Sequence, residues 1–255
     1  MTNTSPPRKV IVLGALSAIA EATCRLLAEE GADIAVLGRD GHRLEDLAAD
    51  LKIRGAGQVM VEPLDLARAA DPTAVLDRCV KALGGCDAVL LFYGLLGDQA
   101  RAEQDWTHAR EILDVNFTSA AGWMLAAANL IEQRADPGGV LMAISSVGGD
   151  RGRRSNYVYG AAKGALSILT QGIAHRFGAT GRHRAVAMKL GFVDTPMTAG
   201  VQKGGPLWAQ PEGVAKTIRQ AMDKGGPMIY APFFWRWIML AIRMTPQAIF
   251  NKVNL

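Results

Sequence analysis

The chain has 255 residues, 49% of them hydrophobic and 20% charged, so it is long enough to bury one large core as a single domain. Its formal charge of +4 does not indicate a nucleic-acid partner, because the excess is confined to the tail: no acidic residue follows Asp223, and the rest of the chain carries 24 basic against 24 acidic residues. The three cysteines form no Cys-x-x-Cys pair, and their odd number argues against a disulfide framework and favours a reducing compartment. The four histidines are scattered and lack the spacing of metal ligands, so we expect no metal site.

Seven short apolar runs without polar alternation predict buried strands. They cover residues 9–13, 34–37, 59–62, 88–92, 140–144, 185–189 and 228–231. Helix-length segments separate the runs, and Asp40 and Asp71-Pro72 are typical caps at the start of two of these helices. This alternation predicts an α/β fold, a Rossmann-type, doubly wound parallel sheet of about seven strands with helices on both faces.

We divide this single domain into three segments. Residues 1–8 are polar with two prolines, and we expect a flexible N-terminus without a signal peptide. Residues 9–230 are expected to form the dinucleotide-binding catalytic domain, and residues 231–255 an apolar, basic, helical C-terminal extension. At 12 residues, the apolar stretch 231–242 is too short to span a bilayer. It could lie at a membrane interface, or pack on the sheet edge or on a neighbouring subunit.

Ligands of parallel sheets bind beyond the carboxyl ends of the strands. The segments 13–20, 92–94, 145–146 and 190–198 should therefore converge on one cleft. In the first of them, a dinucleotide pyrophosphate would meet a helix N-terminus. The candidate cofactor-binding residues there are Gly14, Ser17, Ala18 and Ile19. Only Gly14 matches the usual three-glycine pattern, so this loop taken alone could equally be an ordinary turn.

Three later residues predict carbonyl reduction. Tyr159 and Lys163 are four residues apart, which places them on one face of a helix, and Ser146 ends the preceding strand. An ammonium so placed can depress the pKa of the phenol, which is normally about 10. The phenol could then donate a proton while the serine hydroxyl orients the same substrate oxygen. A solvated helix face is the alternative interpretation of the Tyr159 and Lys163 pair.

With these residues the chain resembles the short-chain dehydrogenase/reductase family over nearly its whole length. By position, the resemblance implies further site residues: Asn116 for a water in the proton relay through Lys163, Asp65 and Leu66 near the adenine, Gly94 beside the cofactor, and Val193 and Thr195 at the nicotinamide carboxamide. It also implies a homodimer or homotetramer. Without the family, Asp65 could be a loop cap and Asn116 a polar residue inside a helix.

The residues that determine the choice of cofactor are expected at the end of the second predicted strand. An acidic residue there would bond the ribose 2′-hydroxyl, whereas an arginine suits a 2′-phosphate. The chain has Gly38-Arg39, so we predict a preference for NADP(H), with NAD(H) as the second possibility. Arg39 as a merely solvated charge is the alternative.

Several other stretches resemble decaprenylphosphoryl-2-keto-ribose reductases, the second subunit of a decaprenylphosphoryl-ribose 2′-epimerase in cell envelope biosynthesis. They are residues 93–98, the arginine-rich run 149–154 and the ending from Tyr230 to Leu255. The resemblance implies a lipid-linked keto-sugar substrate, a flavin oxidase partner that makes the 2′-ketone, and a cytoplasmic location with peripheral contact to the inner face of the plasma membrane. Arg151, Arg153 and Arg154 are candidate ligands of a phosphodiester, or otherwise a subunit interface or solvated loop.

Two other functions stay open at this point. The first is a reductase or dehydrogenase for an unrelated soluble ketone or alcohol, because this fold accepts many substrates through loop variation. The second, from a different class, is a non-catalytic cofactor-binding partner of a flavoenzyme. A turnover assay separates the second from any reductase.

Overall fold

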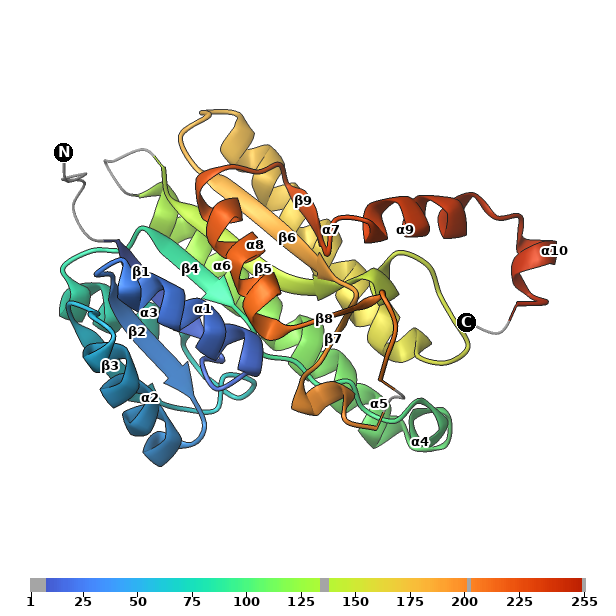
Figure 1. The fold of residues 1–255 in the computed structure, drawn as a ribbon, viewed down its shortest axis with the longest axis horizontal. Helices are drawn as coiled ribbons and strands as arrows, with labels where there is room; N and C mark the ends of the chain where they lie inside the picture. Colours follow the sequence, from blue (N-terminus) through green and yellow to red (C-terminus); the bar gives the residue numbers. More distant parts are fainter. Residues whose placement is uncertain (1–7, 134–137, 201–202, 254–255) are drawn as a thin grey trace.

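The computed structural model describes residues 8–133, 138–200 and 203–253. Seven parallel strands form the central sheet in the order β3-β2-β1-β4-β5-β6-β9 (Figure 1). Their bounds are β1 Lys9–Leu13, β2 Asp33–Gly38, β3 Val59–Pro63, β4 Ala88–Leu91, β5 Val140–Ser146, β6 Arg184–Leu190 and β9 Met228–Ala231. The predicted doubly wound parallel sheet is therefore confirmed. The boundary expected at residue 230 falls at the end of β9, whereas residues 1–7 of the expected flexible N-terminus lie outside the described residues.

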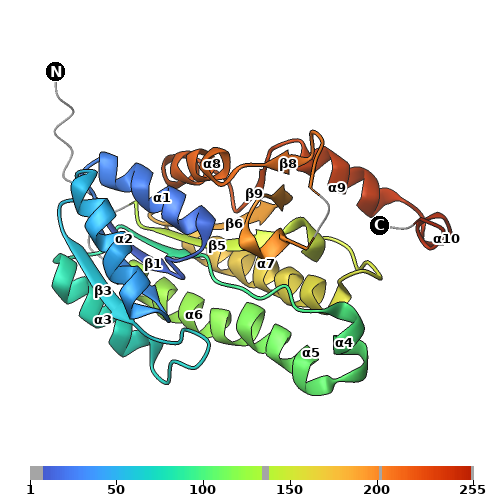
Figure 2. The same cartoon turned by 60° about the horizontal axis from the view of Figure 1, so that its bottom comes forward.

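Helices cover both faces of the sheet (Figure 2). One apolar cluster joins the sheet to α1, α2 and α8, and the other joins it to α3, α6 and α7. The bounds are α1 Ala18–Glu29, α2 Gly41–Ile53, α3 Pro72–Leu83, α4 Gln99–Gln104, α5 Trp106–Leu113, α6 Ser119–Glu132, α7 Tyr157–Gly178 and α8 Pro211–Asp223. Asp40 and Asp71 cap α2 and α3 through their carboxylates, as the sequence predicts.

A second, two-stranded sheet was not expected from the sequence. Its strands are β7 (Phe192–Val193) and β8 (Trp208–Ala209). The Phe192 and Trp208 rings stack with their centroids 5.3 Å apart. Runs of two residues are too short for an alternation pattern, so only the contact between the two segments reveals these strands.

The turn after β5 lies unusually close to α7 because glycines face each other across the contact. A Cβ on Gly164 would come within 2.9 Å of the Gly149 carbonyl oxygen, and one on Gly160 within 2.7 Å of the Gly148 oxygen. Beside this contact, the buried Ser145 hydroxyl bonds the Lys163 carbonyl oxygen at 2.9 Å. The end of β5 is thereby fixed against the first turns of α7.

The C-terminal extension consists of α9 (Trp235–Met244) and α10 (Gln247–Phe250), which project from the body of the molecule in Figure 1. One side of α9 packs inward, with Trp235 and Met239 buried beside Val147. Trp235 lies directly over Gly191, where a Cβ would come within 1.8 Å of the indole nitrogen. No helix in the described part of the chain is both long and apolar enough to cross a membrane.

The glycine contact on α7 can be tested with two substitutions in the same helix. Gly172 is exposed and has open space around it, so Gly172→Ala should raise the free energy of unfolding by about 0.5–1 kcal/mol through helix propensity. Gly164→Ala brings the same propensity gain but a methyl against the Gly149 carbonyl, so it should lower stability by about 1–3 kcal/mol. Urea unfolding measures both; equal stabilisation by the two substitutions would contradict the close contact.

Candidate active site

A cleft of about 390 Å³ opens at the carboxyl edge of the sheet. The four segments that the sequence places there all contribute to its walls: residues 16–19 after β1, 92–94 after β4, 145–148 after β5 and 190–198 after β6. Tyr159 and Lys163 of α7 complete the lining. The predicted convergence on one cleft is thus observed. Among the described residues, no group of three His, Cys, Asp or Glu side chains could hold a metal ion.

Tyr159 and Ser146 meet in this cleft. The serine hydroxyl faces the phenol closely enough to lower its pKa, and it accepts a hydrogen bond from the Gly148 amide at 3.0 Å. Burial raises the pKa of Tyr159 to about 12, and Ser146 acts in the opposite direction with a smaller effect. The phenol is therefore fully protonated at neutral pH.

The expectation that Lys163 depresses the pKa of the phenol is wrong for this structure. The lysine Nζ lies 5.9 Å from the centroid of the Tyr159 ring and donates a hydrogen bond to the Ile144 carbonyl oxygen at 3.0 Å. Desolvation of the hydroxyl is the largest influence on the pKa of Tyr159 and raises it. A phenol with a raised pKa holds its proton before the reaction, although it is a weaker acid than one whose pKa lies near the operating pH.

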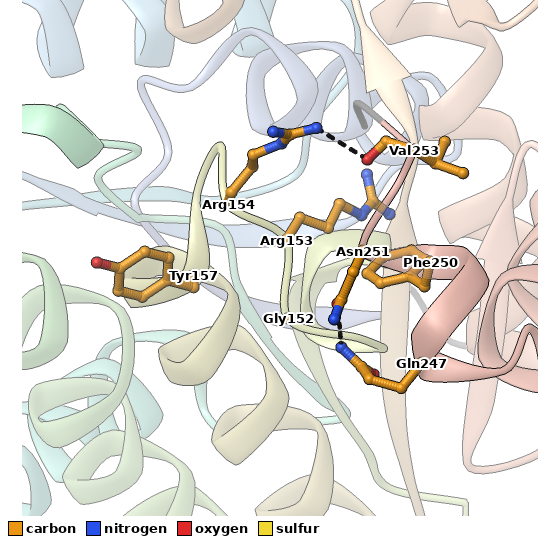
Figure 3. A pocket seen from close by; sticks show the side chains of 8 residues that line it. All are labelled: Gly152, Arg153, Arg154, Tyr157, Gln247, Phe250, Asn251 and Val253. Atoms are coloured by element: carbon orange, nitrogen blue, oxygen red, sulfur yellow. Dashed lines mark hydrogen bonds between the residues drawn. The ribbon is translucent and has the colours of Figure 1, made fainter.

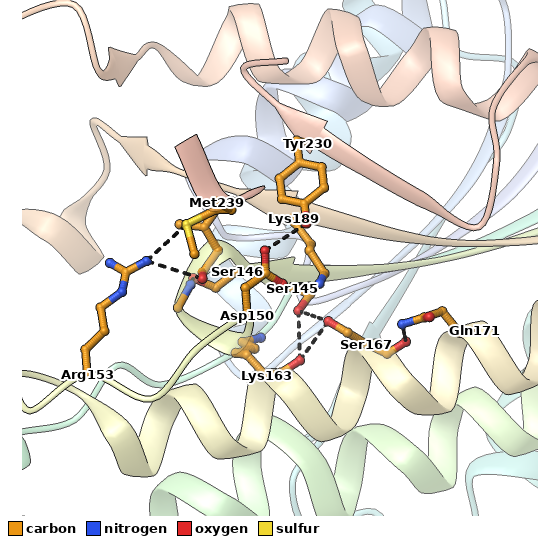
Figure 4. A network of polar contacts seen from close by, with 12 residues as sticks. Ser145, Ser146, Asp150, Arg153, Lys163, Ser167, Gln171, Lys189, Tyr230 and Met239 are labelled. Atoms are coloured by element: carbon orange, nitrogen blue, oxygen red, sulfur yellow. Dashed lines mark hydrogen bonds and ion pairs between the residues drawn. The ribbon is translucent and has the colours of Figure 1, made fainter. Parts of the chain in front are cut away.

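Lys163 is itself a buried cation. Only 4% of the residue is exposed, and burial lowers the pKa of its amine to about 8. Its carbonyl oxygen accepts hydrogen bonds from Ser145 and Ser167, both at 2.9 Å (Figure 4). These bonds fix the backbone from which the ammonium extends to Ile144.

Asn116 lies behind the cleft, in a π-helical turn (Asp114–Thr118) between α5 and α6. Its amide nitrogen donates to the carbonyl oxygens of Ile112 at 2.8 Å and Leu95 at 2.6 Å, and its oxygen accepts from the Leu95 amide. Gly94 is held close to it: a Cβ there would lie 2.8 Å from the Asn116 oxygen and 3.2 Å from Lys163 Nζ. Asn116 thus ties the segment after β4 to the π-turn beside Lys163.

The first turn after β1 fits a dinucleotide phosphate. Ser17 caps α1, with its Oγ accepting from the Ala20 amide at 3.2 Å, and Ser17, Ala18 and Ile19 all line the cleft. The cleft therefore borders the N-terminus of a 12-residue helix, where the first amides have no partner within the helix. Gly14 adopts φ +85° and approaches Tyr93, so it shapes the turn without lining the cleft.

Only some of the remaining predicted cofactor residues line the cleft. Val193 and Thr195 line the cleft, whereas Arg39, Asp65 and Leu66 do not. Asp65 caps its own loop by accepting from the Ala67 amide at 3.0 Å, which is the alternative left open for it. Buried Leu66 accepts a bond from Trp123 through its carbonyl oxygen.

Arg43 is a cleft residue that the sequence analysis missed. It stands in the first turn of α2, where Asp40 accepts from its amide, and its side chain lines the cleft with residues 16–19. Its guanidinium lies 3.4 Å from Glu21. The sequence feature that could have identified Arg43 is its position in the first turn of the helix after β2.

The three candidate arginines separate into two kinds. Arg151 bonds the carbonyl oxygens of Ile242 and Thr245 and stacks over the Phe250 ring at 3.8 Å, and Arg154 bonds the Val253 carbonyl oxygen at 3.1 Å. Both guanidinium groups therefore hold the C-terminal extension. Only Arg153 lines the cleft that contains Tyr159.

The chain is similar to one protein family and to several oxidoreductases. Residues 8–205 match the family model described as short chain dehydrogenase. An uncharacterized oxidoreductase of Mycobacterium tuberculosis is 33% identical over 246 residues, covering 96% of each chain. One of Streptomyces coelicolor is 33% identical over 250 residues, covering 97% of this chain and 96% of the other.

Two solved structures share the fold. A short-chain type dehydrogenase/reductase from Mycobacterium ulcerans has a TM-score of 0.75 and 22% identity, covering 88% of this chain and 87% of its own. Levodione reductase has a TM-score of 0.77 and 20% identity, covering 88% and 95%. At these identities the likeness concerns the fold alone.

The buried cation at Lys163 has a measurable effect on stability. The folded pKa of about 8 lies below the unfolded value of 10.5, so the charged form costs stability below pH 8, and this cost disappears as the pH rises toward 10.5. Lys163→Met should therefore raise the free energy of unfolding at pH 7, by roughly 1–3 kcal/mol, and by less at pH 10. Urea unfolding of both proteins at the two pH values tests this. A difference that does not change with pH would contradict a buried, titrating lysine.

Proposed function

Since the chain belongs to the short-chain dehydrogenase/reductase family and is therefore an NAD(P)-dependent oxidoreductase, we propose that it reduces a ketone to a secondary alcohol. The observation that carries this proposal is that Tyr159, Ser146 and Lys163 line the same cleft at the carboxyl edge of the sheet. A bound nicotinamide would supply the hydride to the carbonyl carbon. The protein's own residues supply the proton and hold the carbonyl oxygen.

Each residue of the proposed set has a defined part in the reaction. Tyr159 donates its proton to the carbonyl oxygen, and the Ser146 hydroxyl orients that oxygen. Lys163, whose ammonium lies near the phenol, stabilises the negative charge that develops as the proton leaves and bonds the nicotinamide ribose. Asn116 keeps Gly94 and the π-turn in place behind Lys163 and holds the water through which the proton is replaced.

The proposed cofactor is NADP(H), bound along residues 14–19 with the nicotinamide end at Val193 and Thr195. Two arginines near the end of β2 support the choice, because a guanidinium suits a 2′-phosphate. Arg39 follows the strand directly and is exposed, and Arg43 lines the cleft itself. Asp65 and Leu66 keep their proposed place near the adenine, at the loop that follows β3.

The proposed substrate is the 2′-keto group of a polyprenyl-phosphoryl pentose, made by a flavin-dependent oxidase acting before this enzyme in cell envelope biosynthesis. The resemblance of residues 93–98, 149–154 and 230–255 supports it, as does the mixed character of the cleft. Phe92, Phe192 and Met197 supply apolar walls, and Arg153 supplies a positive charge. Family members commonly act on small molecules and form oligomers, and we propose a homodimer or homotetramer here.

The C-terminal extension supports a location at the cytoplasmic surface of the plasma membrane. Phe233 is 76% exposed and Trp237 61%, and Leu240 and Met244 continue the same outward stripe of α9. Arg236 and Arg243 belong to the same helix, and no acidic residue follows Asp223. An apolar stripe with basic flanks suits an anionic lipid surface, where aromatic and basic residues are favoured.

Reduction of a polyprenyl-phosphoryl 2′-keto-pentose in detergent should proceed with NADPH and depend on Tyr159. We expect Tyr159→Phe to lower kcat by about 10² to 10⁴-fold, because general acid catalysis is lost, while the Kd for NADPH stays within about twofold, since the hydroxyl is one of many contacts. NADPH oxidation and cofactor fluorescence measure the two quantities.

Turnover of simple ketones in place of the lipid-linked sugar would favour an unrelated soluble substrate. A variant with most of its activity would refute the mechanism, and an inactive natural protein would favour a non-catalytic cofactor-binding partner.

Cofactor preference should depend on the two arginines after β2. We expect the natural protein to have a lower KM for NADPH than for NADH. Arg43→Gln should raise the KM for NADPH by about 10- to 100-fold, as expected for loss of a bond to a charged group, and Arg39→Gln by less because Arg39 does not line the cleft. The KM for NADH should change little in either variant. A natural preference for NADH, or equal effects on both cofactors, would contradict the assignment.

A further inference from the structure

The Arg153 guanidinium lacks the partners that a desolvated cation normally has. Its Nε is buried and without a hydrogen-bond partner in the described part of the chain. One terminal nitrogen approaches only the Val147 carbonyl oxygen at 3.4 Å and the Met239 sulfur at 3.3 Å (Figure 4). A thioether is a weak acceptor, and 3.4 Å is long for a hydrogen bond. Most of the five donors of this side chain are thus unused.

Nearby acids do not neutralise this charge. Burial lowers the pKa of Arg153, and the closest carboxylate that acts on it is Asp150. That carboxylate is already engaged by the buried Lys189 ammonium and by the Tyr230 hydroxyl at 2.8 Å. By contrast, the partly buried Arg219 has a carboxylate of its own, Glu30, at 2.7 Å.

Arg153 also stands between two cavities. On one side it lines the cleft with Ser146 and Tyr159. On the other it lines a second cavity of about 380 Å³ between the loop before α7 and α10. The lining of the second cavity is Gly152, Arg153, Arg154, Tyr157, Gln247, Phe250, Asn251 and Val253 (Figure 3). Asn156 also lines the cleft, and its side-chain amide oxygen Oδ1 is likewise buried without a hydrogen-bond partner among the described residues.

We propose that Arg153 binds a phosphate ester or diester group of the substrate, and that the second cavity receives the apolar chain attached to this group. A guanidinium bonds phosphate oxygens in pairs, which would use the free Nε together with a terminal nitrogen. Phe250, Val253 and Tyr157 provide apolar surface for this chain. Arg154, Gln247 and Asn251 provide polar surface around the charged group. The assignment rests on the proposed function, because the phosphate must belong to the carbonyl compound in the cleft.

Arg151 has a positioning task in this arrangement. Its bonds to the Thr245 carbonyl oxygen and the Gln247 side chain, at 2.6 and 2.9 Å, hold the segment from which Phe250 projects. Its stacking on the Phe250 ring fixes the wall of the second cavity. Two arginines of the same loop, separated by Gly152, thus serve different parts of one site.

A binding measurement tests this without requiring turnover. The protein saturated with NADP⁺ is titrated calorimetrically with farnesyl phosphate, farnesol and inorganic phosphate. We expect farnesyl phosphate to bind the natural protein more tightly than the other two. Arg153→Met, which retains the apolar stem, should weaken farnesyl phosphate about 10- to 100-fold and leave farnesol unchanged. Arg153→Lys should recover part of the loss, and Arg110→Met, the same substitution at an exposed position, should change nothing.

Three results would overturn the assignment. One is equal affinity for farnesyl phosphate in the natural protein and Arg153→Met. Another is an equal loss for farnesol and farnesyl phosphate, which would make Arg153 a packing residue for Met239. The third is tight binding of inorganic phosphate alone, which would leave the second cavity without a role. If Arg153→Met fails to bind NADP⁺, Arg153→Lys is used in its place. A charge-based site is supported if this variant still binds farnesyl phosphate more tightly than farnesol and its affinity for farnesol is unchanged. An equal loss of affinity for both ligands opposes it. Each of these results is independent of whether Tyr159 is required for ketone reduction.

Discussion

The site depends on how closely the turn after β5 approaches α7. The contact requires glycines on both sides, Gly148 and Gly149 in the turn and Gly160 and Gly164 in the helix. Because Tyr159 and Lys163 each precede one of the helix glycines, the same contact that packs the helix places their side chains beside Ser146. Hydrogen bonds from Ser145 and Ser167 to the Lys163 carbonyl oxygen reinforce it. Fold and chemistry therefore share one constraint.

Burial at this contact determines the protonation states of the two central groups. The phenol of Tyr159 loses hydration, so its pKa rises, and the ammonium of Lys163 loses hydration, so its pKa falls. The first shift keeps the phenol protonated, and the second makes the charge of the lysine easier to change. Desolvation of Lys163 lowers the free energy of unfolding, and favourable interactions elsewhere in the fold offset this loss, as is usual for a functional site.

The sequence predicted the parts of this structure that depend on local pattern. All seven strands of the main sheet, the capped starts of α2 and α3, and the convergence of four loops follow from apolar runs and turn residues. It could not give what depends on three-dimensional contact: the direction of the Tyr159 pKa shift, the two-residue strands β7 and β8, and the cleft position of Arg43. The arginine run shows the same limit, because residues two positions apart in one loop have different partners: Arg151 contacts α9 and α10, and Arg153 lines the cleft.

The most direct test of this account is the ionisation of Tyr159 itself. In protein labelled with ¹³C at the tyrosine ζ carbon, the Tyr159 resonance can be assigned by its loss in Tyr159→Phe and followed with pH by NMR. The account predicts a protonated phenol throughout the neutral and mildly alkaline range, with titration only near a pKa of about 12. A resonance that titrates near pH 7 would show a phenolate at working pH and contradict the central claim.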